Sequence, residues 1–434
     1  MSHSSNNLAR RMGGLSHRWL PFADAATVDL TLPRLWRLSL FQLSTGMAIV
    51  LLTGTLNRVM VVELGQGTSL VSLMLAIPLL LAPARALIGY RSDHHRSYLG
   101  WRRIPYLWSG TLMQFGGLAF MPFALILMIE PHSGPPIIGP IAAMGSFLLT
   151  GLGMHVSQTA GLALATDLAT EETRPRVVAL LYLMLLVGMI SSAVIFAALL
   201  DDFSYVRLIQ VIQSAAVITV IRNVAAMWKQ EVRYPELTDH ERERPTFGSA
   251  WGEFINLPKA RRLLWALGLG TMGFTMQDIL LEPYGAHVLG LSVSETTLLT
   301  ALFAGGMVLA LLMTSRTLKK GVDPIRLASV GVLIGIVAFV AVILSAPLHS
   351  TGLFQIGATL IGVGNGLFAV GMLTAAMVFG GAKMAGLTLG AWGAVQAAAT
   401  GLAMFSGGAI RDVVTGWADA GLLGIAMQTP ASGY

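Results

Sequence analysis

The stretch LWRLSLFQLSTGMAIVLLTGTLNRVMVV, residues 35–62, decides the fold class of this chain. It is mostly apolar, and it is longer than the roughly 20 helical residues needed to cross a lipid core about 30 Å thick. Runs of similar length recur along the chain, each ended by a short polar turn. The sequence therefore predicts an all-α polytopic membrane protein.

Eleven segments meet this length requirement. We expect membrane spans at residues 35–62, 69–90, 105–129, 137–165, 177–200, 205–228, 263–290, 295–315, 325–346, 352–379 and 386–410.

The composition excludes several classes of protein. Apolar residues make up 54% of the chain and charged residues 12%, which leaves too little polar surface for a water-soluble domain. The net charge of +6 comes from basic residues between the apolar spans, which favours anionic lipid headgroups over nucleic acid. The absence of cysteine excludes disulfides, thiolate metal sites and a cysteine nucleophile.

The basic residues also predict the orientation. If the N-terminus is cytoplasmic, 25 of the 28 Lys and Arg residues fall on the cytoplasmic side, and only Arg58, Arg207 and Arg411 fall on the other. Under the positive-inside rule this places the N-terminus in the cytoplasm and the C-terminus, after eleven crossings, outside. Residues 1–34 form a cytoplasmic segment without the features of a cleaved signal peptide, and residues 411–434 form a periplasmic tail.

A hydrophilic connection at 229–262 divides the chain into two bundles, residues 35–228 and 263–410. Within this cytoplasmic linker, apolar residues recur at helical spacing, which predicts an amphipathic helix in the membrane interface; they are Phe247, Trp251, Phe254 and Ile255.

The two bundles echo each other. LTGLGMHVSQTAGLALAT of span 4 aligns with LIGVGNGLFAVGMLTAAM of span 10, so that Gly151 matches Gly362 and Gly153 matches Gly364. Two pseudo-symmetric six-helix halves are the natural inference. Only five spans are visible in the second half, so we expect either that a twelfth helix is missing from this sequence or that the protein has eleven.

The loop GYRSDHHRSYLGWRRIPY lies between spans 2 and 3. It resembles a lengthened form of the loop motif of the major facilitator superfamily, in which an acid and following basic residues latch the cytoplasmic side. The candidate latch residues are Gly89, Asp93, Arg102 and Arg103, and Asp93 is expected to cap the next helix or to pair with the arginines. A solvated basic loop remains the alternative.

Three further segments make the resemblance specific. They are SDHHRSYLGWRRIPY, GMHVSQTAGLALATDLATEETRPRVVALLYLMLLVGM and MQDILLEPYGAHVLGLSVSETTLLTALF. They resemble the bacteriochlorophyll delivery family, a branch of the major facilitator superfamily found in photosynthetic bacteria. The N-terminal segment PFADAATVDLTLPRLWRLSLFQLSTGMAIVLLTGTLNRVMVVELG, residues 21–65, resembles the LhaA and PucC branches of that family, with LhaA favoured.

The resemblance implies an assembly factor for the light-harvesting antenna, with the core antenna favoured, that binds or delivers bacteriochlorophyll and docks antenna polypeptides in the membrane. Bacteriochlorophyll is therefore its expected cofactor. The resemblance also implies residence in the bacterial inner membrane, cytoplasmic or intracytoplasmic. The expected partners are antenna polypeptides and membrane lipids, with the reaction-centre core complex and bacteriochlorophyll synthase as further candidates.

Ionisable residues inside spans are costly and therefore informative. Asp278 and Glu282 of span 7 are four residues apart, hence on one face of a regular helix. One interpretation is structural: Gln277 and the two acids tie span 7 to Asn57 and Arg58 of span 1. In the other interpretation, the two acids bind and release the protons that drive transport.

His155 and Gln158 of span 4 lie on one polar stripe with Thr159 and Thr166. A neutral imidazole or an amide oxygen suits the axial position of a bacteriochlorophyll magnesium ion, which makes His155 and Gln158 candidate pigment ligands. A hydrogen bond between helices is the alternative for His155.

Span 11 carries small residues at the spacing of close helix packing, among them Gly386, Gly390 and Gly393. No set of residues predicts a metal site, a P-loop or a catalytic nucleophile, so we do not expect an enzyme. The competing function is a proton-coupled secondary transporter of a small amphiphile, for which a wet, polar central cavity would speak.

Overall fold

A computed structural model describes most of the chain, and all regular structure in the part that it describes is helical. The described residues are 30–81, 88, 92, 101–129, 135, 137–170, 173–231, 256, 258–319, 321–423 and 434, with the side chains of 174, 175, 315, 319 and 377–390 excepted. The predicted amphipathic helix of the linker, and Gly89 and Asp93 of the loop, lie outside these residues.

The described part of the first half consists of span 1 and five further long helices. Span 1 is built from α2 (Leu32–Leu38), α3 (Leu40–Ile49) and two π-helical segments, η2 (Val50–Leu56) and η3 (Val59–Glu63). The following helices are α4 (Thr68–Leu80), α6 (Ile104–Ile129), α7 (Ile138–Leu168), α8 (Arg174–Leu199) and α9 (Tyr205–Met227).

In the second half, span 7 consists of α11 (Pro258–Thr275), the 3-10 segment η5 (Met276–Ile279) and α12 (Leu281–Leu289). It is followed by α13 (Val293–Lys319), α14 (Pro324–Ser345) and α15 (Thr351–Asp419). The first helix of this half therefore begins five residues before the expected position 263, at Pro258. Residues 411–419, expected in a tail, continue α15.

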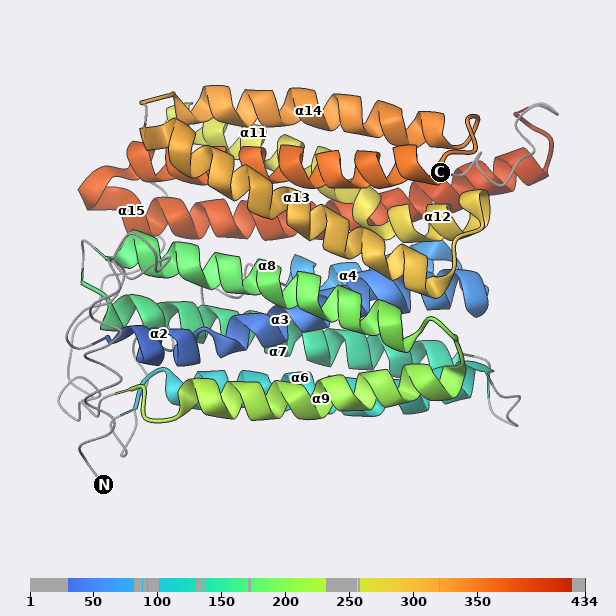
Figure 1. The fold of residues 1–434 in the computed structure, drawn as a ribbon, viewed down its shortest axis with the longest axis horizontal. Coiled ribbons are helices and arrows are strands. Elements are labelled where there is room, and N and C mark those ends of the chain that lie inside the picture. Colours follow the sequence, from blue (N-terminus) through green and yellow to red (C-terminus); the bar gives the residue numbers. More distant parts are fainter. Residues whose placement is uncertain are drawn as a thin grey trace.

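The long element α15 holds two of the expected spans. At about 1.5 Å per residue, a straight helix would separate Phe354 from Arg411 by roughly 85 Å. Instead, a chain of short contacts joins them, since the Tyr284 ring lies 5.4 Å from Phe354 and 5.7 Å from Tyr434, whose hydroxyl accepts a hydrogen bond from Arg411. The element therefore runs as two antiparallel arms, which Figure 1 shows side by side.

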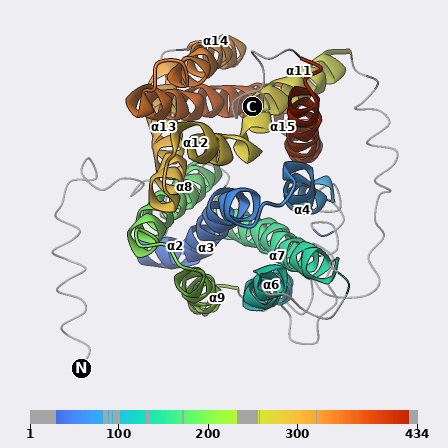
Figure 2. The same cartoon turned by 90° about the vertical axis from the view of Figure 1, so that its right-hand side faces the viewer.

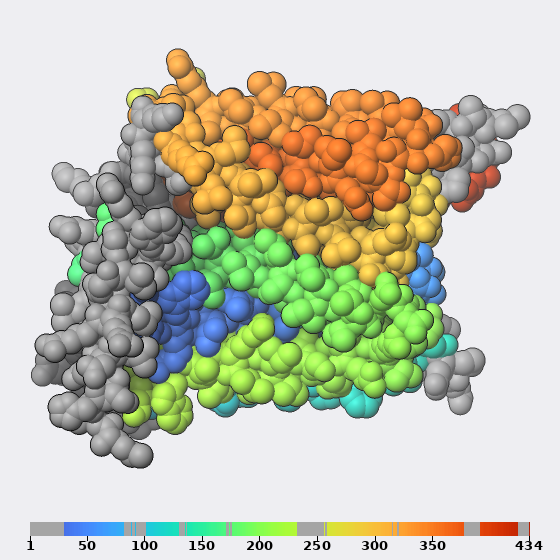
Figure 3. Space-filling model, in the orientation of Figure 1, coloured from blue at the N-terminus to red at the C-terminus, as the bar shows by residue number. Residues whose placement is uncertain are grey.

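The helices lie side by side in two groups. Figure 2 looks along them from one end: α2 to α9 form one group and α11 to α15 the other. The groups meet where α13 packs on α8 and where α15 packs on α4; Figure 3 shows the α8 and α13 side of this boundary. We call the end of the bundle that carries Met227 and Pro258 the linker end, on the left in Figure 1, and the other the far end.

The aligned glycines make equivalent contacts in the two halves. A side-chain carbon at Gly151 would meet Pro78 of α4, and one at Gly362 would meet Phe303 of α13. A carbon at Gly153 would meet α6, and one at Gly364 would meet α14. Span 4 (α7) therefore contacts spans 2 and 3 (α4 and α6) in the way that span 10 (the first arm of α15) contacts spans 8 and 9 (α13 and α14). This equivalence confirms the internal repeat.

Eight helices in the described part of the chain are long and apolar enough to cross a membrane by themselves, and Thr68–Leu80 is a shorter apolar helix. Span 1 is the most enclosed of the eight, while α14 has most of its surface exposed. Exposed apolar side chains cover the outside of the bundle, including Phe120, Phe123, Trp265, Ile343 and Leu333. Such a surface suits a lipid environment.

Candidate functional site: a central cavity and the polar clusters around it

A cavity of about 640 Å³ lies between the two halves. Span 1, α4, α7 and α8 line it from the first half, and both arms of α15 line it from the second. Its apolar lining residues include Ile49, Leu52, Met74, Leu75, Pro78, Leu79, Phe147, Met154, Leu162, Val178, Leu373 and Trp392. Its size is within the range of about 300–1,000 Å³ that holds a drug-sized molecule.

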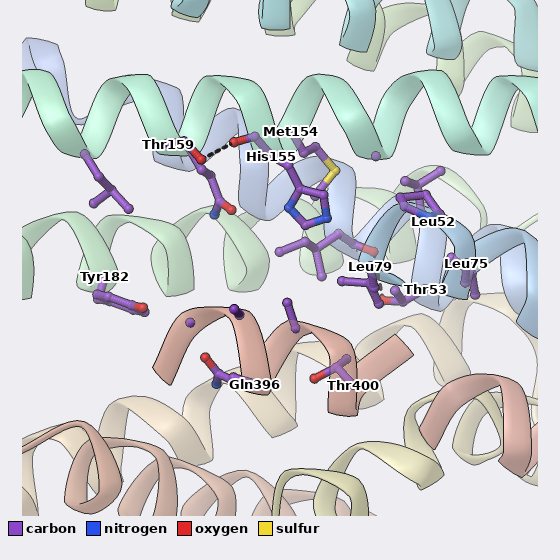
Figure 4. A pocket seen from close by; sticks show the side chains of 18 of the residues that line it. Leu52, Thr53, Leu75, Leu79, Met154, His155, Thr159, Tyr182, Gln396 and Thr400 are labelled. Carbon is purple, nitrogen blue, oxygen red and sulfur yellow. Dashed lines mark hydrogen bonds between the residues drawn. The ribbon is translucent and has the colours of Figure 1, made fainter. Parts of the chain in front are cut away.

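His155 and Gln158 both line this cavity, on the same side of α7 as Thr159. His155 is buried, and its backbone carbonyl accepts a hydrogen bond of 2.7 Å from the Thr159 hydroxyl. Figure 4 shows the imidazole reaching from α7 towards the opposite wall, where Gln396 and Thr400 stand on α15. Thr166, the last member of the predicted stripe, is not among the lining residues.

The opposite wall carries polar residues that the sequence analysis did not select. Trp392, Gln396 and Thr400 follow one another at intervals of four residues, so they share one face of the second arm of α15. The indole nitrogen of Trp392 is buried and has no hydrogen-bond partner among the described residues. The four-residue spacing of these larger side chains within a run of Gly and Ala was the signal that could have identified this wall.

The small residues of span 11 divide between two environments. Gly393 lines the cavity, and no atom lies within 4 Å of the position that a side-chain carbon would take there. The close helix contact expected at Gly393 is therefore wrong, because its open side faces the cavity. Gly401 and Gly408 instead make the close contacts, to Leu79 and Ser72 of α4. The side chains around Gly386 and Gly390 lie outside the described residues.

Glu282 and Asp278 occupy different settings, because Asp278 lies in the 3-10 segment η5 and Glu282 in the first turn of α12. Glu282 is buried against Gly54 of span 1, and its Oε1 accepts a hydrogen bond of 2.6 Å from Thr300 of α13. Asp278 is half-buried and accepts a hydrogen bond from the neighbouring Gln277 side chain.

The predicted tie between spans 1 and 7 exists, but with other partners. Asn57 donates a hydrogen bond of 3.1 Å to the carbonyl oxygen of Ile279, and Arg58 donates one of 3.3 Å to the carbonyl oxygen of Leu291. The ion pair of Arg58 is with Glu63 of its own span. No ion pair joins Arg58 to Asp278 or Glu282, all three of which the structure describes, so that expected pairing is wrong.

At the linker end, two acids hold the start of α6. The Glu231 carboxylate accepts hydrogen bonds from three consecutive backbone amides, those of Arg102, Arg103 and Ile104. Asp167 lies 3.0 Å from Arg103 Nε and 3.5 Å from Arg102 Nη2. The two latch arginines thus contact Asp167 near the end of α7 and Glu231 after the end of α9, and Glu231 caps the start of α6. The cap or ion pair predicted for Asp93 lies outside the described residues.

At the far end, the second arm of α15 holds the start of α4. The Asp412 carboxylate accepts hydrogen bonds from the backbone amides of Thr68, at 3.2 Å, and Ser69, at 2.7 Å. Arg411 contacts Asp412 at 3.1 Å, and its guanidinium lies 4.8 Å from the centre of the Tyr434 ring. These contacts join the two halves at the end of the bundle away from the linker.

Residues 55–434 match the PUCC protein family. The chain belongs to this family. Its relatives include a protein PucC of Rhodovulum sulfidophilum, 51% identical over 95% of this chain and 92% of that protein. An uncharacterised protein from the puhA–bchM intergenic region of Rhodobacter capsulatus is 53% identical over 98% of this chain and 90% of that protein. These two identities do not separate the LhaA branch from the PucC branch.

Solved structures that are similar to this one include transporters. A bacterial homologue of the lysosomal transporter Spinster, facing inward, has a TM-score of 0.67 and 16% identity over 92% of this chain and 86% of its own. A POT family transporter has a TM-score of 0.69 and 11% identity over 91% of this chain and 94% of its own. The fold is that of the major facilitator superfamily, and the chain is a multi-pass membrane protein.

Proposed function

We propose that this protein is an assembly factor for the light-harvesting antenna of a photosynthetic bacterium. It acts in the inner membrane with its N-terminus in the cytoplasm, receives bacteriochlorophyll in its central cavity and docks antenna polypeptides on its lipid-facing surface. It catalyses no covalent step. Membership of the PUCC protein family supports the assembly role, and the cavity lined by His155 supports the pigment.

The character of the cavity separates this function from proton-coupled transport of a small amphiphile. Most of its lining side chains are apolar, and its polar groups are few and uncharged apart from the ionisable His155. Glu282 and Asp278 are not among the lining residues. A greasy cavity with a few placed polar groups is suited to a large apolar ligand.

The residues present fit a bacteriochlorophyll. The bound pigment would supply a magnesium ion, and His155 and Gln158 would hold it through an imidazole nitrogen or an amide oxygen. The buried Trp392 indole lacks an acceptor among the described residues, which is costly unless a ligand provides one. The open space at Gly393 leaves room for a flat ring system beside Trp392.

The test is the absorption spectrum of the protein purified in mild detergent from cells that make bacteriochlorophyll. We expect bound pigment together with co-purifying antenna polypeptides. His155→Leu should reduce the bound pigment or shift its absorption bands while the yield of folded protein and of antenna polypeptides stays close to wild type.

His349→Asn is the matched control. His349 is exposed, lies in the turn before α15, and has a left-handed backbone (φ 45°) that asparagine tolerates. It should leave the spectrum unchanged. Colourless wild-type protein that still binds antenna polypeptides would contradict pigment binding. Wild-type protein that co-purifies with no antenna polypeptides would contradict the assembly role.

A further inference from the structure

A second site lies outside the central cavity, where spans 1, 7 and 8 meet. Span 7 is discontinuous here, with η5 separating α11 from α12. Glu282 stands in the first turn of α12 and has a relative exposure of only 4%. In membrane proteins, broken helices at the boundary between repeats characteristically form ion sites, because they free backbone and side-chain oxygens from helical hydrogen bonding.

The walls of this junction are oxygen-rich. From span 1, Gly54 lies directly against the Glu282 carboxylate, so that a side-chain carbon at Gly54 would be 2.6 Å from Oε1. From α13, Thr300 donates to the same Oε1 at 2.6 Å. One turn earlier, the hydroxyl of Thr297 lies 3.4 Å from that of Thr55.

Two buried oxygens at the junction have no donor. They are Oε2 of Glu282 and Oδ1 of Asn57, and neither has a hydrogen-bond partner among the described residues. Asn57 is fully buried, and its amide nitrogen is already directed at the Ile279 carbonyl oxygen. The nearby cation, Arg58, forms its ion pair with Glu63 and a hydrogen bond with the Leu291 carbonyl oxygen, so it makes neither with Glu282. A buried carboxylate without a compensating charge is strongly unfavourable.

We propose that this junction is a sodium site, formed by the Glu282 carboxylate, the Asn57 amide oxygen and the threonine hydroxyls beside them. Hard cations take oxygen ligands of these types. One carboxylate among neutral oxygens balances a single positive charge, so a monovalent ion leaves the buried site neutral and a divalent ion does not. The ligands come from both halves, so the ion stabilises the arrangement in which spans 1, 7 and 8 are packed together.

The test is the thermal unfolding of the purified full-length protein in NaCl, with choline chloride holding the ionic strength constant and KCl as a parallel series. A ligand that binds only the folded state raises the unfolding temperature with its concentration, and we expect a saturable rise of roughly 2 °C or more in NaCl. Glu282→Gln should abolish the rise. Asn57→Ser, which shortens one ligand, should move its midpoint to a several-fold higher sodium concentration.

Glu295→Gln is the control, because Glu295 is an exposed acid at the start of the same α13, and its carboxylate accepts hydrogen bonds from the backbone amide and the hydroxyl of Ser292. It should respond to sodium as the wild type does. The proposal is overturned if the unfolding temperature is the same in NaCl and in choline chloride at both neutral and alkaline pH. It is also overturned by a pH-dependent unfolding temperature that is sodium-independent and lost in Glu282→Gln, since the occupant is then a proton on Glu282. A sodium response that persists in both Glu282→Gln and Asn57→Ser also overturns it.

Discussion

Arg58 shows how one residue's partner depends on the local helix type. Residues five apart lie on different faces of an α-helix, and hydrophobic periodicity assumes an α-helix throughout. Span 1 is π-helical over Val59–Glu63, where hydrogen bonding runs from i to i+5 and residues five apart lie above one another. This places Glu63 over Arg58. The sequence therefore predicted a buried cation correctly but could not predict its acid, since composition does not report a π-helix.

At this scale we predict that Glu63→Gln destabilises the protein by about 1–3 kcal/mol, because it leaves the guanidinium of Arg58 without a counter-charge. The value is below that of a fully buried pair because the Glu63 side chain is 31% exposed. Thermal unfolding in detergent measures the change. Adding Arg58→Gln should recover part of the loss, whereas Glu282→Gln should not. Rescue by Glu282→Gln instead would indicate that Arg58 pairs with Glu282.

At the scale of elements, the apolar runs predicted the positions of the spans well, because burial in lipid demands length and hydrophobicity from every crossing. They did not predict the break in span 7. Gln277, Asp278 and Glu282 interrupt the apolar pattern there, but a polar residue in a span is as compatible with a regular helix facing a cavity as with a broken one. For the same reason the sequence did not predict that Trp392, Gln396 and Thr400 line the cavity. The many small residues around them suggested helix packing instead.

The glycines provide a prediction with an internal control. Gly362→Ala would place a methyl group against the Phe303 carbonyl oxygen of α13, and we expect it to cost about 1–3 kcal/mol through overpacking. Gly393→Ala enters open space and should be neutral or slightly stabilising, because alanine favours the helix. Thermal unfolding compares the two. Equal effects would mean that helix propensity, and not the contact with α13, governs both positions.

At the scale of the whole molecule, Asp412 ties the halves at the far end by capping α4 from α15. We predict that Asp412→Ala loosens this closure, because two amides at the start of α4 lose their acceptor. Since the chain has no cysteine, cysteines for spin labels can be introduced at Gln66 and Asp419 without background. Their distance distribution should shift to longer or broader values in Asp412→Ala. An unchanged distribution would show that other contacts hold the far end closed.

The orientation is a second prediction at this scale. The distribution of 25 basic residues against 3 predicts that the linker end lies in the cytoplasm. Reporter fusions after Met227 should therefore be active only as cytoplasmic reporters, and fusions after Leu200 only as periplasmic ones. The reverse pattern would contradict the orientation while leaving the fold intact.

The matching contacts of Gly151 with Gly362, and of Gly153 with Gly364, also bear on ancestry. A side-chain carbon at any of these four glycines would lie within 3 Å of an atom of a neighbouring helix, so a replacement requires that helix to shift. Their correspondence is the trace that duplication of a single gene leaves behind. If the halves arose in this way, the boundary between them corresponds to the interface between two copies of a six-helix unit.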